Sequence, residues 1–232
     1  MKFYDVLSEY YDDIFKLNQN TVDMILENIK GKKVLDLACG TGNYSIALDA
    51  AGKKVTGIDL DSIMIEKAKK KNHNILFKQG NMLSLAESIG EEKFDGVFCI
   101  GNSIVHLNNL YEIGKVFQDV YNHLNVGGKF IVQIINYDRI LGENIKGLPS
   151  IKTDDVIFNR HYILKENKII FRGEIETKEE KFINEVELFP LLRKDTEIIL
   201  EKVGFKDFEL YGAFNGEEYN KGSFNLIVCA TK

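Results

Sequence analysis

The first 140 residues alternate between short apolar runs and segments with helical periodicity, and this alternation constrains the fold most strongly. The apolar runs are rich in Val, Ile, Leu and Phe and lie at residues 33–37, 54–58, 75–78, 94–100 and 129–135. Helices are expected between them, at residues 44–51, 62–71 and 110–124. Because buried parallel strands form continuous apolar runs separated by helices, the pattern predicts a doubly wound α/β core.

The pattern changes on either side of this core. Residues 5–29 carry two helical stretches, which we expect to pack over one end of the sheet. After Asn136, polar and apolar residues alternate in segments 156–164, 168–177 and 181–188, which predicts a three-stranded antiparallel insert. The two prolines, Pro149 and Pro190, lie near the borders of that insert, where we expect them to interrupt regular structure.

A helix at residues 194–203, ended by Gly204, precedes two last strands at 205–211 and 224–231, which should close the sheet as an antiparallel pair. Residues 1–145 and 191–232 are therefore assigned to a core with an N-terminal helical cover. Residues 146–190 are assigned to the insert.

Charge and composition exclude several classes of protein. The 30 Lys and Arg against 35 Asp and Glu give a net charge of −5, which argues against nucleic-acid or anionic-membrane binding. The N-terminal residues mix acids with aromatics, and no later apolar run approaches the roughly 18 residues of a membrane span, so we expect a cytoplasmic protein. Cys39, Cys99 and Cys229 lack metal or disulfide spacing and are interpreted as reduced, small apolar residues.

The strongest local motif is the sequence VLDLACGTG at residues 34–42, a buried strand that leads into a glycine turn and a helix. Gly40 and Gly42 allow a tight turn and a close approach of the backbone to a ligand, at the sheet edge where parallel α/β folds bind ligands. Asp59 ends the next strand, from which a carboxylate can accept both hydroxyls of a ribose. The motif therefore predicts a nucleotide-like cofactor.

Two residues bear on the kind of cofactor. A dinucleotide fingerprint would place a third glycine at position 45, where this chain has Ser45. Asp36, just before the turn, would repel a pyrophosphate and suits a ligand with a cationic end. An NAD-dependent oxidoreductase is thus disfavoured, although it remains an alternative at this stage.

The series Asp36-x-Ala38-x-Gly40-x-Gly42 resembles the first motif of class I S-adenosylmethionine-dependent methyltransferases. Later segments continue the resemblance in order along the chain: Asp59-Leu60, Gly80-Asn81-Met82, Phe94-Asp95-Gly96-Val97 and Leu124-x-x-Gly127-Gly128. The resemblance implies a Rossmann-like, doubly wound, seven-stranded and mostly parallel sheet with a small antiparallel β insert that serves as a lid. The family pattern usually has glycine at position 38, where this chain has Ala38.

The resemblance also implies which residues bind S-adenosyl-L-methionine, whose product would be S-adenosyl-L-homocysteine. Asp36 and the backbone from Ala38 through Gly40 to Gly42 would face the methionine part, and Asp59 would bind the ribose. The remaining residues assigned to the cofactor surround the adenine or form the pocket wall: Leu60, Met64, Asn81, Met82 and Ile100.

The sequence Gly-Asn-Ser-x-x-His-Leu at 101–107, with Asn-Tyr-Asp at 136–138, resembles the glycine/sarcosine N-methyltransferase-like branch. In that branch a basic residue commonly precedes Asn-Tyr-Asp and holds a substrate carboxylate, whereas Ile135 stands here. Asn102 is a candidate for orienting the acceptor or for capping the following helix. His106 is a candidate general base or a residue that stabilises its own loop.

Tyr11 is expected to close over the cofactor; the alternative is that one of Tyr10 and Tyr11 lies in the core and the other is exposed. On a strand of the insert, alternation sends Arg160 and Tyr162 to one face and His161 to the other. Arg160 and Arg172 are candidates for holding an acidic substrate, with a solvated surface as the alternative. No metal site is expected.

These observations favour an enzyme that methylates a small molecule by in-line transfer, with nitrogen as the first choice of acceptor atom. O-methylation of a small carboxylate or hydroxyl compound is the alternative, followed by a binding module without catalytic activity. The expected partner is a small-molecule acceptor, without nucleic acid or membrane, and the expected state is a monomer or homodimer.

Overall fold

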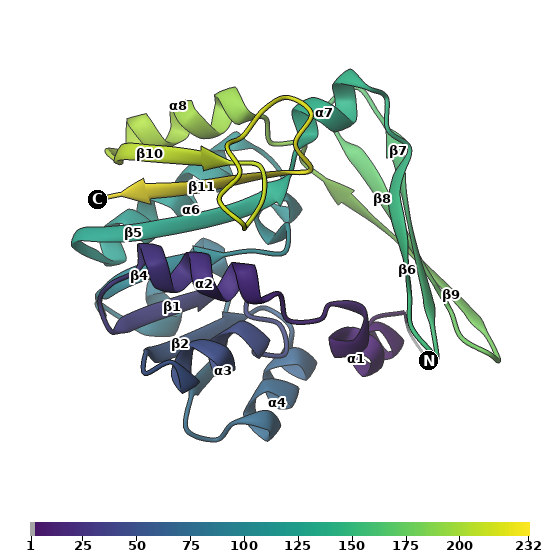
Figure 1. Cartoon of the computed structure of the whole chain (residues 1–232), viewed down its shortest axis with the longest axis horizontal. Helices are drawn as coiled ribbons and strands as arrows, with labels where there is room; N and C mark the ends of the chain where they lie inside the picture. The colour runs from purple at the N-terminus through teal and green to yellow at the C-terminus, as the bar shows by residue number, and fades with distance from the viewer. Residues whose placement is uncertain (1–2) are drawn as a thin grey trace.

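The computed structural model describes residues 3–232 and contains two separate β-sheets (Figure 1). The α-helices are α1 (Phe3–Ile14), α2 (Gln19–Asn28), α3 (Asn43–Ala50), α4 (Ser62–Lys71), α5 (Leu85–Ile89), α6 (Leu110–His123), α7 (Tyr137–Gly142) and α8 (Arg193–Val203). Two short 3-10 helices are η1 (Met82–Ser84) and η2 (Ser103–His106). The strands are β1 (Lys33–Leu37), β2 (Lys54–Asp59), β3 (Leu76–Gln79), β4 (Phe94–Cys99), β5 (Leu124–Ile135), β6 (Gly147–Lys152), β7 (Ile157–Leu164), β8 (Ile169–Glu176), β9 (Lys181–Leu188), β10 (Lys206–Tyr211) and β11 (Asn225–Thr231).

The larger sheet has seven strands in the order β10-β11-β5-β4-β1-β2-β3. Strands β1 to β5 pair in parallel, whereas β11 pairs antiparallel with both β5 and β10. The predicted doubly wound, mostly parallel sheet with a closing antiparallel pair is confirmed. The strand order reverses between β1 and β4, which is the place where open α/β sheets bind ligands beyond the carboxyl ends of their strands.

Apolar layers cover both faces of this sheet. On one face, α2, α3 and α4 bury residues such as Ile25, Leu48 and Ala68 against the strands. On the other face, α5, α6 and α8 contribute a second layer, in which Phe117 packs edge-on against Phe130 with ring centroids 5.1 Å apart. This two-sided burial explains why the parallel strands are continuous apolar runs in the sequence.

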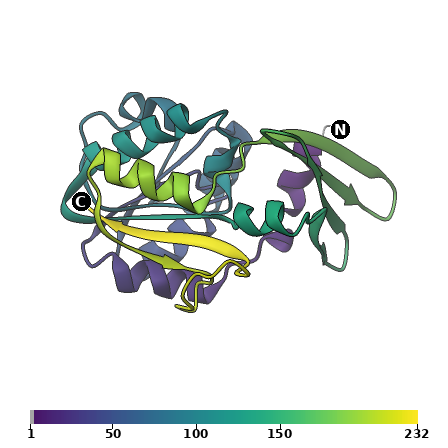
Figure 2. The same cartoon turned by 90° about the horizontal axis from the view of Figure 1, so that it is seen from above.

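The smaller sheet has four antiparallel strands in the order β6-β7-β8-β9, not the three expected from the sequence. The additional strand, β6, contains Pro149, which was expected to interrupt regular structure. Proline is tolerated there because β6 is an edge strand that pairs only with β7. Figure 2 shows this sheet standing apart from the α/β core, with α1 and α7 between the two.

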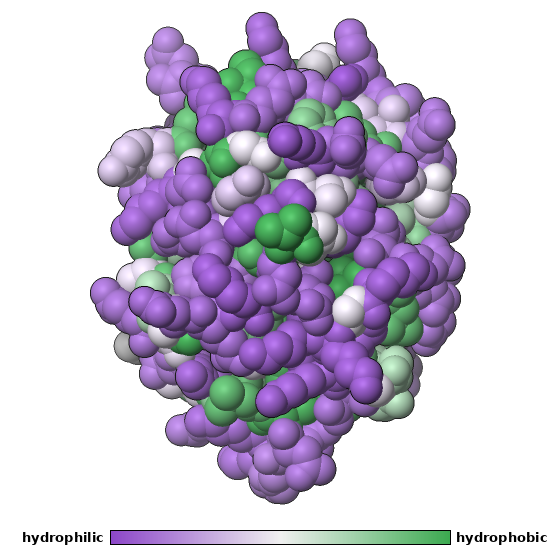
Figure 3. All heavy atoms as spheres, turned by 90° about the vertical axis from the view of Figure 1, so that its left-hand side faces the viewer, coloured by the Kyte–Doolittle hydropathy of each residue, from purple (hydrophilic) through white to green (hydrophobic). Residues whose placement is uncertain are grey.

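Helix α1 packs against the smaller sheet through an apolar cluster. Val6 and Ile14 of α1 are buried against Val156, Phe158 and Ile175. Helix α1 thus packs against the insert, whereas α2 contributes to the apolar layer on one face of the larger sheet. At the opposite end of the molecule, polar side chains cover most of the surface and apolar residues form small groups (Figure 3). Within residues 3–232, no helix is long and apolar enough to cross a membrane.

The glycine at the start of α3 provides a stability test. Gly42 has φ = 78°, and a Cβ there would lie 2.7 Å from Cζ of Phe77. Gly52 has a similar backbone angle, φ = 87°, but a Cβ there would have no atom within 4 Å. An alanine at position 52 would therefore suffer the same backbone strain as one at position 42, without a steric clash. We expect Gly52→Ala to lower the free energy of unfolding by about 1 kcal/mol, and Gly42→Ala by about 2–4 kcal/mol. Urea unfolding of both variants would measure the difference. Equal losses in the free energy of unfolding would show that the close contact between position 42 and Phe77 does not add to the backbone strain.

Candidate active site

The turn after β1 is built on backbone conformations that favour glycine. Gly40 and Gly42 have φ = 54° and 78°, and Ala38 also lies in the left-handed region at φ = 67°. The N–H groups of Ala38 and Cys39 both donate to the carbonyl of Ile58, which attaches the turn to the end of β2. Ala38 therefore occupies a strained conformation that costs about 1 kcal/mol relative to glycine, and this conformation explains why a glycine is usual there.

Two carboxylates lie beneath this turn. Asp36 is 2% exposed, and its Oδ2 accepts a hydrogen bond of 2.7 Å from the hydroxyl of Ser45. Oδ2 of Asp59 accepts from the N–H of Gly40 at 2.7 Å, and Oδ1 accepts from the N–H of Asp61 at 2.9 Å. Within residues 3–232, neither Asp36 nor Asp59 forms a salt bridge with a basic side chain. The site is therefore strongly acidic.

Burial shifts the titration of both carboxyl groups. Burial raises the pKa of Asp36 to about 7, with a further increase from the neighbouring Asp59 and a partly offsetting decrease from the Ser45 hydrogen bond. Burial also raises the pKa of Asp59, although the N–H groups of Asp61 and Gly40 oppose that change. An uncompensated buried carboxylate is costly, and a bound cation or hydroxyl donor would relieve that cost.

Tyr11 comes from α1 and lies against the turn. A Cβ added to Gly40 would lie 3.1 Å from the Tyr11 hydroxyl, so the phenol reaches the glycine directly. Burial, followed by the negative charges of Asp59 and Asp36, raises the pKa of Tyr11. Tyr11 therefore lies over the glycine turn.

Sequence reasoning missed the residue that anchors α1 at this place. Asp12 Oδ1 accepts from the Thr41 hydroxyl at 2.5 Å and from the Asn43 side-chain amide at 2.9 Å, and Oδ2 forms an ion pair with Lys71. No spacing in the sequence indicates this contact, because its members lie on α1, the turn, α3 and α4. Lys67 adds a hydrogen bond of 2.5 Å to the carbonyl of Ser8.

The other residues assigned to the cofactor follow the carboxyl ends of β2, β3 and β4. Leu60 is 66% exposed, whereas Met64 and Ile100 are buried and Met82 is partly buried. The side chain of Asn81 caps η1 by accepting from the N–H of Leu83 at 2.9 Å, a bond that uses the amide oxygen and not the NH₂ group. These positions surround one end of the sheet, at the place where the strand order reverses.

Asn102 joins the loop after β4 to the end of β5. Its Oδ1 accepts from the N–H of Ile135 at 2.9 Å, and its Nδ2 donates to the hydroxyl of Tyr137 at 2.9 Å. The side chain does not cap η2, although Asn102 occupies the N-cap position with φ = 67°. A second bond, from the N–H of Gly101 to Oε1 of Gln133 at 2.7 Å, fixes the same loop. Asn102 therefore determines the shape of this loop.

His106 ends η2, and its side chain makes no hydrogen bond to the residues that the structure describes. Its side chain is open to solvent, yet the surrounding protein lowers its pKa below the usual value because the charged form is partly desolvated. The imidazole is therefore neutral at pH 7 and has a free nitrogen that can accept a proton.

The Asn-Tyr-Asp segment makes structural contacts. Asn136 donates to the carbonyls of Lys221 and Ser223, at 3.1 and 2.9 Å, and Asp138 accepts from the N–H of Arg193 at the start of α8. Tyr137 is fully buried beside Asn102. Among residues 3–232, no group of three or more His, Cys, Asp or Glu side chains could hold a metal ion, and the three cysteines are free.

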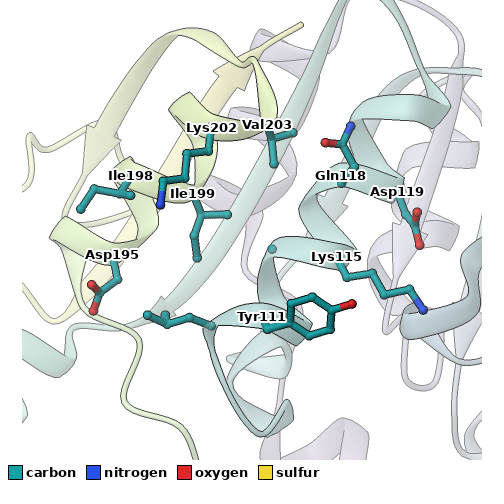
Figure 4. A pocket seen from close by; sticks show the side chains of 11 residues that line it. Tyr111, Lys115, Gln118, Asp119, Asp195, Ile198, Ile199, Lys202 and Val203 are labelled. Atoms are coloured by element: carbon teal, nitrogen blue, oxygen red, sulfur yellow. The ribbon is translucent and has the colours of Figure 1, made fainter.

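A surface hollow of about 600 Å³ lies elsewhere, between α6 and α8. Tyr111 and Lys115 of α6 and Asp195, Ile199 and Lys202 of α8 are among the residues that line it (Figure 4). None of the residues that the sequence assigned to the site lines this hollow. The motif residues therefore define a different place, at the carboxyl ends of the parallel strands.

A strand order that reverses beside a glycine turn, with the buried Asp36 and the partly buried Asp59 below it, is typical of α/β proteins that bind a nucleotide-like ligand, and the unpaired carboxylates favour a ligand with positive charge. Residues 34–128 match the family model described as "Methyltransferase domain". The chain is 32% identical over 207 residues to glycine/sarcosine N-methyltransferase from Aphanothece halophytica, covering 87% of this chain and 76% of the relative. It is 26% identical over 236 residues to the enzyme of the same name from Halorhodospira halochloris, covering 92% and 82%.

Among solved structures, an S-adenosylmethionine-dependent methyltransferase from Clostridium acetobutylicum has the same fold, with a TM-score of 0.83 and 21% identity over 98% of both chains. The chain belongs to the class I S-adenosylmethionine-dependent methyltransferases. It is an enzyme whose cofactor is S-adenosylmethionine, and the NAD-dependent and non-catalytic alternatives are set aside.

The residues of the turn fit this cofactor chemically. Asp36 and Asp59 lack a basic partner in the described structure, and S-adenosylmethionine has a sulfonium, an α-ammonium and two ribose hydroxyls, which supply positive charge and hydrogen-bond donors. The acidic turn that would repel a pyrophosphate is therefore suited to a cationic nucleoside.

The pKa of Asp36 predicts how cofactor binding depends on pH. Because burial raises that pKa to about 7, the fraction of ionised Asp36 increases between pH 6 and 8, and affinity for the cationic cofactor should increase with it. Asp36→Asn, which resembles the protonated acid, should lower affinity at pH 8 by about 10–100-fold and remove the pH dependence. Calorimetric titration at three pH values measures both effects. An unchanged pH dependence in Asp36→Asn would contradict this assignment.

Proposed function

We propose that this enzyme transfers the methyl group of S-adenosylmethionine to the nitrogen of a small molecule. One observation carries the proposal: the similarity to glycine/sarcosine N-methyltransferase covers 87% of the chain, far more than the 34–128 segment matched by the general methyltransferase model. The similarity therefore includes parts of the chain outside residues 34–128, and we expect residues that contact the acceptor to lie in those parts.

We assign the cofactor to Asp36, Asp59 and the turn from Ala38 through Gly40 to Gly42. Leu60, Met64, Asn81, Met82 and Ile100 complete its surroundings, with Tyr11 lying over the turn. The sulfonium of the bound cofactor supplies an electrophilic methyl carbon and a neutral thioether leaving group. The protein's contribution is to align the acceptor nitrogen in line with that carbon, and no nucleophilic side chain is needed.

The loop fixed by Asn102 fits this aligning role. Its bonds to Ile135 and Tyr137 hold the end of β4 against the end of β5. A rigid loop at this point keeps the acceptor from moving away from the methyl group. An acceptor amine must present a free lone pair, and His106, which is neutral at pH 7, is our candidate to accept the proton that the amine loses.

We further propose that residues 1–145 and 191–232 act as the cofactor-binding core and residues 146–190 as a lid over the acceptor. We expect the enzyme to act in the cytoplasm as a monomer or homodimer, on a free small molecule and not on nucleic acid or membrane.

The direct test of N-methylation uses S-adenosylmethionine with a labelled methyl group. Panels of small amines, hydroxyl compounds and carboxylic acids would be incubated with the purified enzyme, and the labelled atom would be located by NMR. We expect label on nitrogen. Label in an ether or a methyl ester would instead establish O-methylation.

The proposed role of His106 predicts a pH profile. The rate should fall as pH decreases through the pKa of His106, which lies below the ordinary histidine value of about 6.5, because the protonated ring cannot accept a proton. His106→Gln should lower kcat by about 10²-fold or more, and the rate of this variant should no longer fall as the pH decreases through that range. His73→Gln, at an exposed histidine after α4, is the control and should leave the profile unchanged. An acidic limb that persists in His106→Gln would exclude the base role.

A further inference from the structure

The hollow between α6 and α8 is a surface that the cofactor site does not use. It has a volume of about 600 Å³ and lies on the face of the larger sheet opposite α2, α3 and α4. Apolar side chains line much of it, among them Leu110, Ile198, Ile199 and Val203. Tyr111, at its edge, is 81% exposed. An exposed aromatic ring beside an apolar hollow is typical of a surface that binds another molecule.

A glycine in the middle of α6 contributes to this hollow. The nearest atom of another element to a Cβ added at Gly114 would be Cγ2 of Ile199, at 3.8 Å, which is an ordinary van der Waals distance. The chain's own packing therefore has room for a side chain at this position. Because glycine is unfavourable inside a helix, an alanine there would stabilise α6. What the glycine provides is a place where another backbone can approach α6 closely.

Helices α6 and α8 lie side by side and run in the same direction. Gly114 of α6 lies beside Ile199 of α8. Further along both helices, the ring of Tyr121 packs edge-on against Phe205, with ring centroids 5.1 Å apart. The hollow therefore has one end where both helices begin and another end where both helices finish, with Gly114 near its middle.

The two ends of the hollow carry charges of opposite sign. Asp195 lies with Tyr111 at the end where the helices begin, and Lys202 lies at the other end (Figure 4). Lys115 and Asp119 also line the hollow. Among residues 3–232, none of these four charged side chains forms a salt bridge. Unpaired charges of both signs are thus separated along the length of the hollow.

We propose that this hollow binds the same hollow of a second copy of the chain, so that the enzyme forms a homodimer through α6 and α8. In a two-fold symmetric dimer the same surface is used by both copies, so the surface must be complementary to itself. A two-fold axis through the middle of the hollow places the Asp195 end of one copy against the Lys202 end of the other. Each interface then contains two Asp195–Lys202 pairs.

The apolar part of the hollow fits the same arrangement. With Gly114 of both copies near the axis, the two α6 helices can approach closely. Tyr111 of each copy then faces Val203 at the far end of the other copy's hollow, which buries a ring that a single chain leaves in water. None of the residues assigned to the cofactor lines the hollow, so the dimer leaves the cofactor site open. The inference does not depend on which atom the enzyme methylates.

The first experiment measures the mass of the purified enzyme in solution. Sedimentation from about 1 to 100 μM should show a dimer that dissociates on dilution. Gly114→Leu should raise the dissociation constant of the dimer by about 10-fold or more, because leucine fills the hollow. Its urea midpoint should not fall below that of the wild type, since leucine favours a helix more than glycine does. Calorimetry with S-adenosylhomocysteine should give an unchanged affinity.

The second experiment reverses the charges at the two ends. Asp195→Lys and Lys202→Asp should each weaken the dimer by about 10–100-fold, because like charges then meet across the axis. The double variant Asp195→Lys/Lys202→Asp should dimerise again. An equimolar mixture of the two single variants should also form a dimer, since opposite charges meet only between the two different chains. A change in the fold of one chain could not produce association on mixing.

Glu201→Lys and Lys194→Asp are the matched controls. Both residues are exposed on α8, neither lines the hollow, and the two substitutions change the net charge as Asp195→Lys and Lys202→Asp do. They should leave the dissociation constant unchanged. A monomer at every concentration would overturn the proposal and leave the hollow to a partner of another kind. A dimer that is insensitive to Gly114→Leu, or single variants that stay apart when mixed, would overturn this interface.

Discussion

The structure depends on the burial of a carboxylate without a basic partner. Asp36 lies at the end of a central strand, held by Ser45 and close to Asp59. In water such a group would be ionised at pH 7, but here burial brings its pKa to about 7, so the unliganded site is held in an unfavourable electrostatic state. A ligand with a positive charge relieves this state, which links the choice of a sulfonium cofactor to one residue and its burial.

Helix α1 contacts both the glycine turn after β1 and the smaller sheet. One side of α1 is anchored to the turn and to α4 through Asp12, Thr41 and Lys71. Its apolar side packs against the smaller sheet. Tyr11 and Phe15 lie between them. Both sets of contacts use the same short helix, so α1 joins the glycine turn to the smaller sheet through packed side chains.

Much of the fold could be predicted from the sequence because local patterns determine it. The parallel strands, the helices between them and the closing antiparallel pair follow from periodicity, and the glycine turn follows from its residues. Strand β6 was missed because it contains Pro149, and only its position at the sheet edge makes that proline acceptable. The sequence left Asn102 either to orient the acceptor or to cap the following helix; in the folded chain the side chain does not cap η2, and its amide oxygen accepts from the N–H of Ile135 at the end of β5.

The sequence by itself determined the α/β core, the position of the cofactor turn and the acidic character of the site, since these depend on residues that are close along the chain. Tertiary structure decided which distant groups meet. It placed Asp12 against Lys71, Tyr11 over Gly40 and Asn102 against Tyr137. Local sequence patterns do not predict such contacts, because the contacts form only when separate helices and strands pack together. Which polar group pairs with which is then decided by their positions in space.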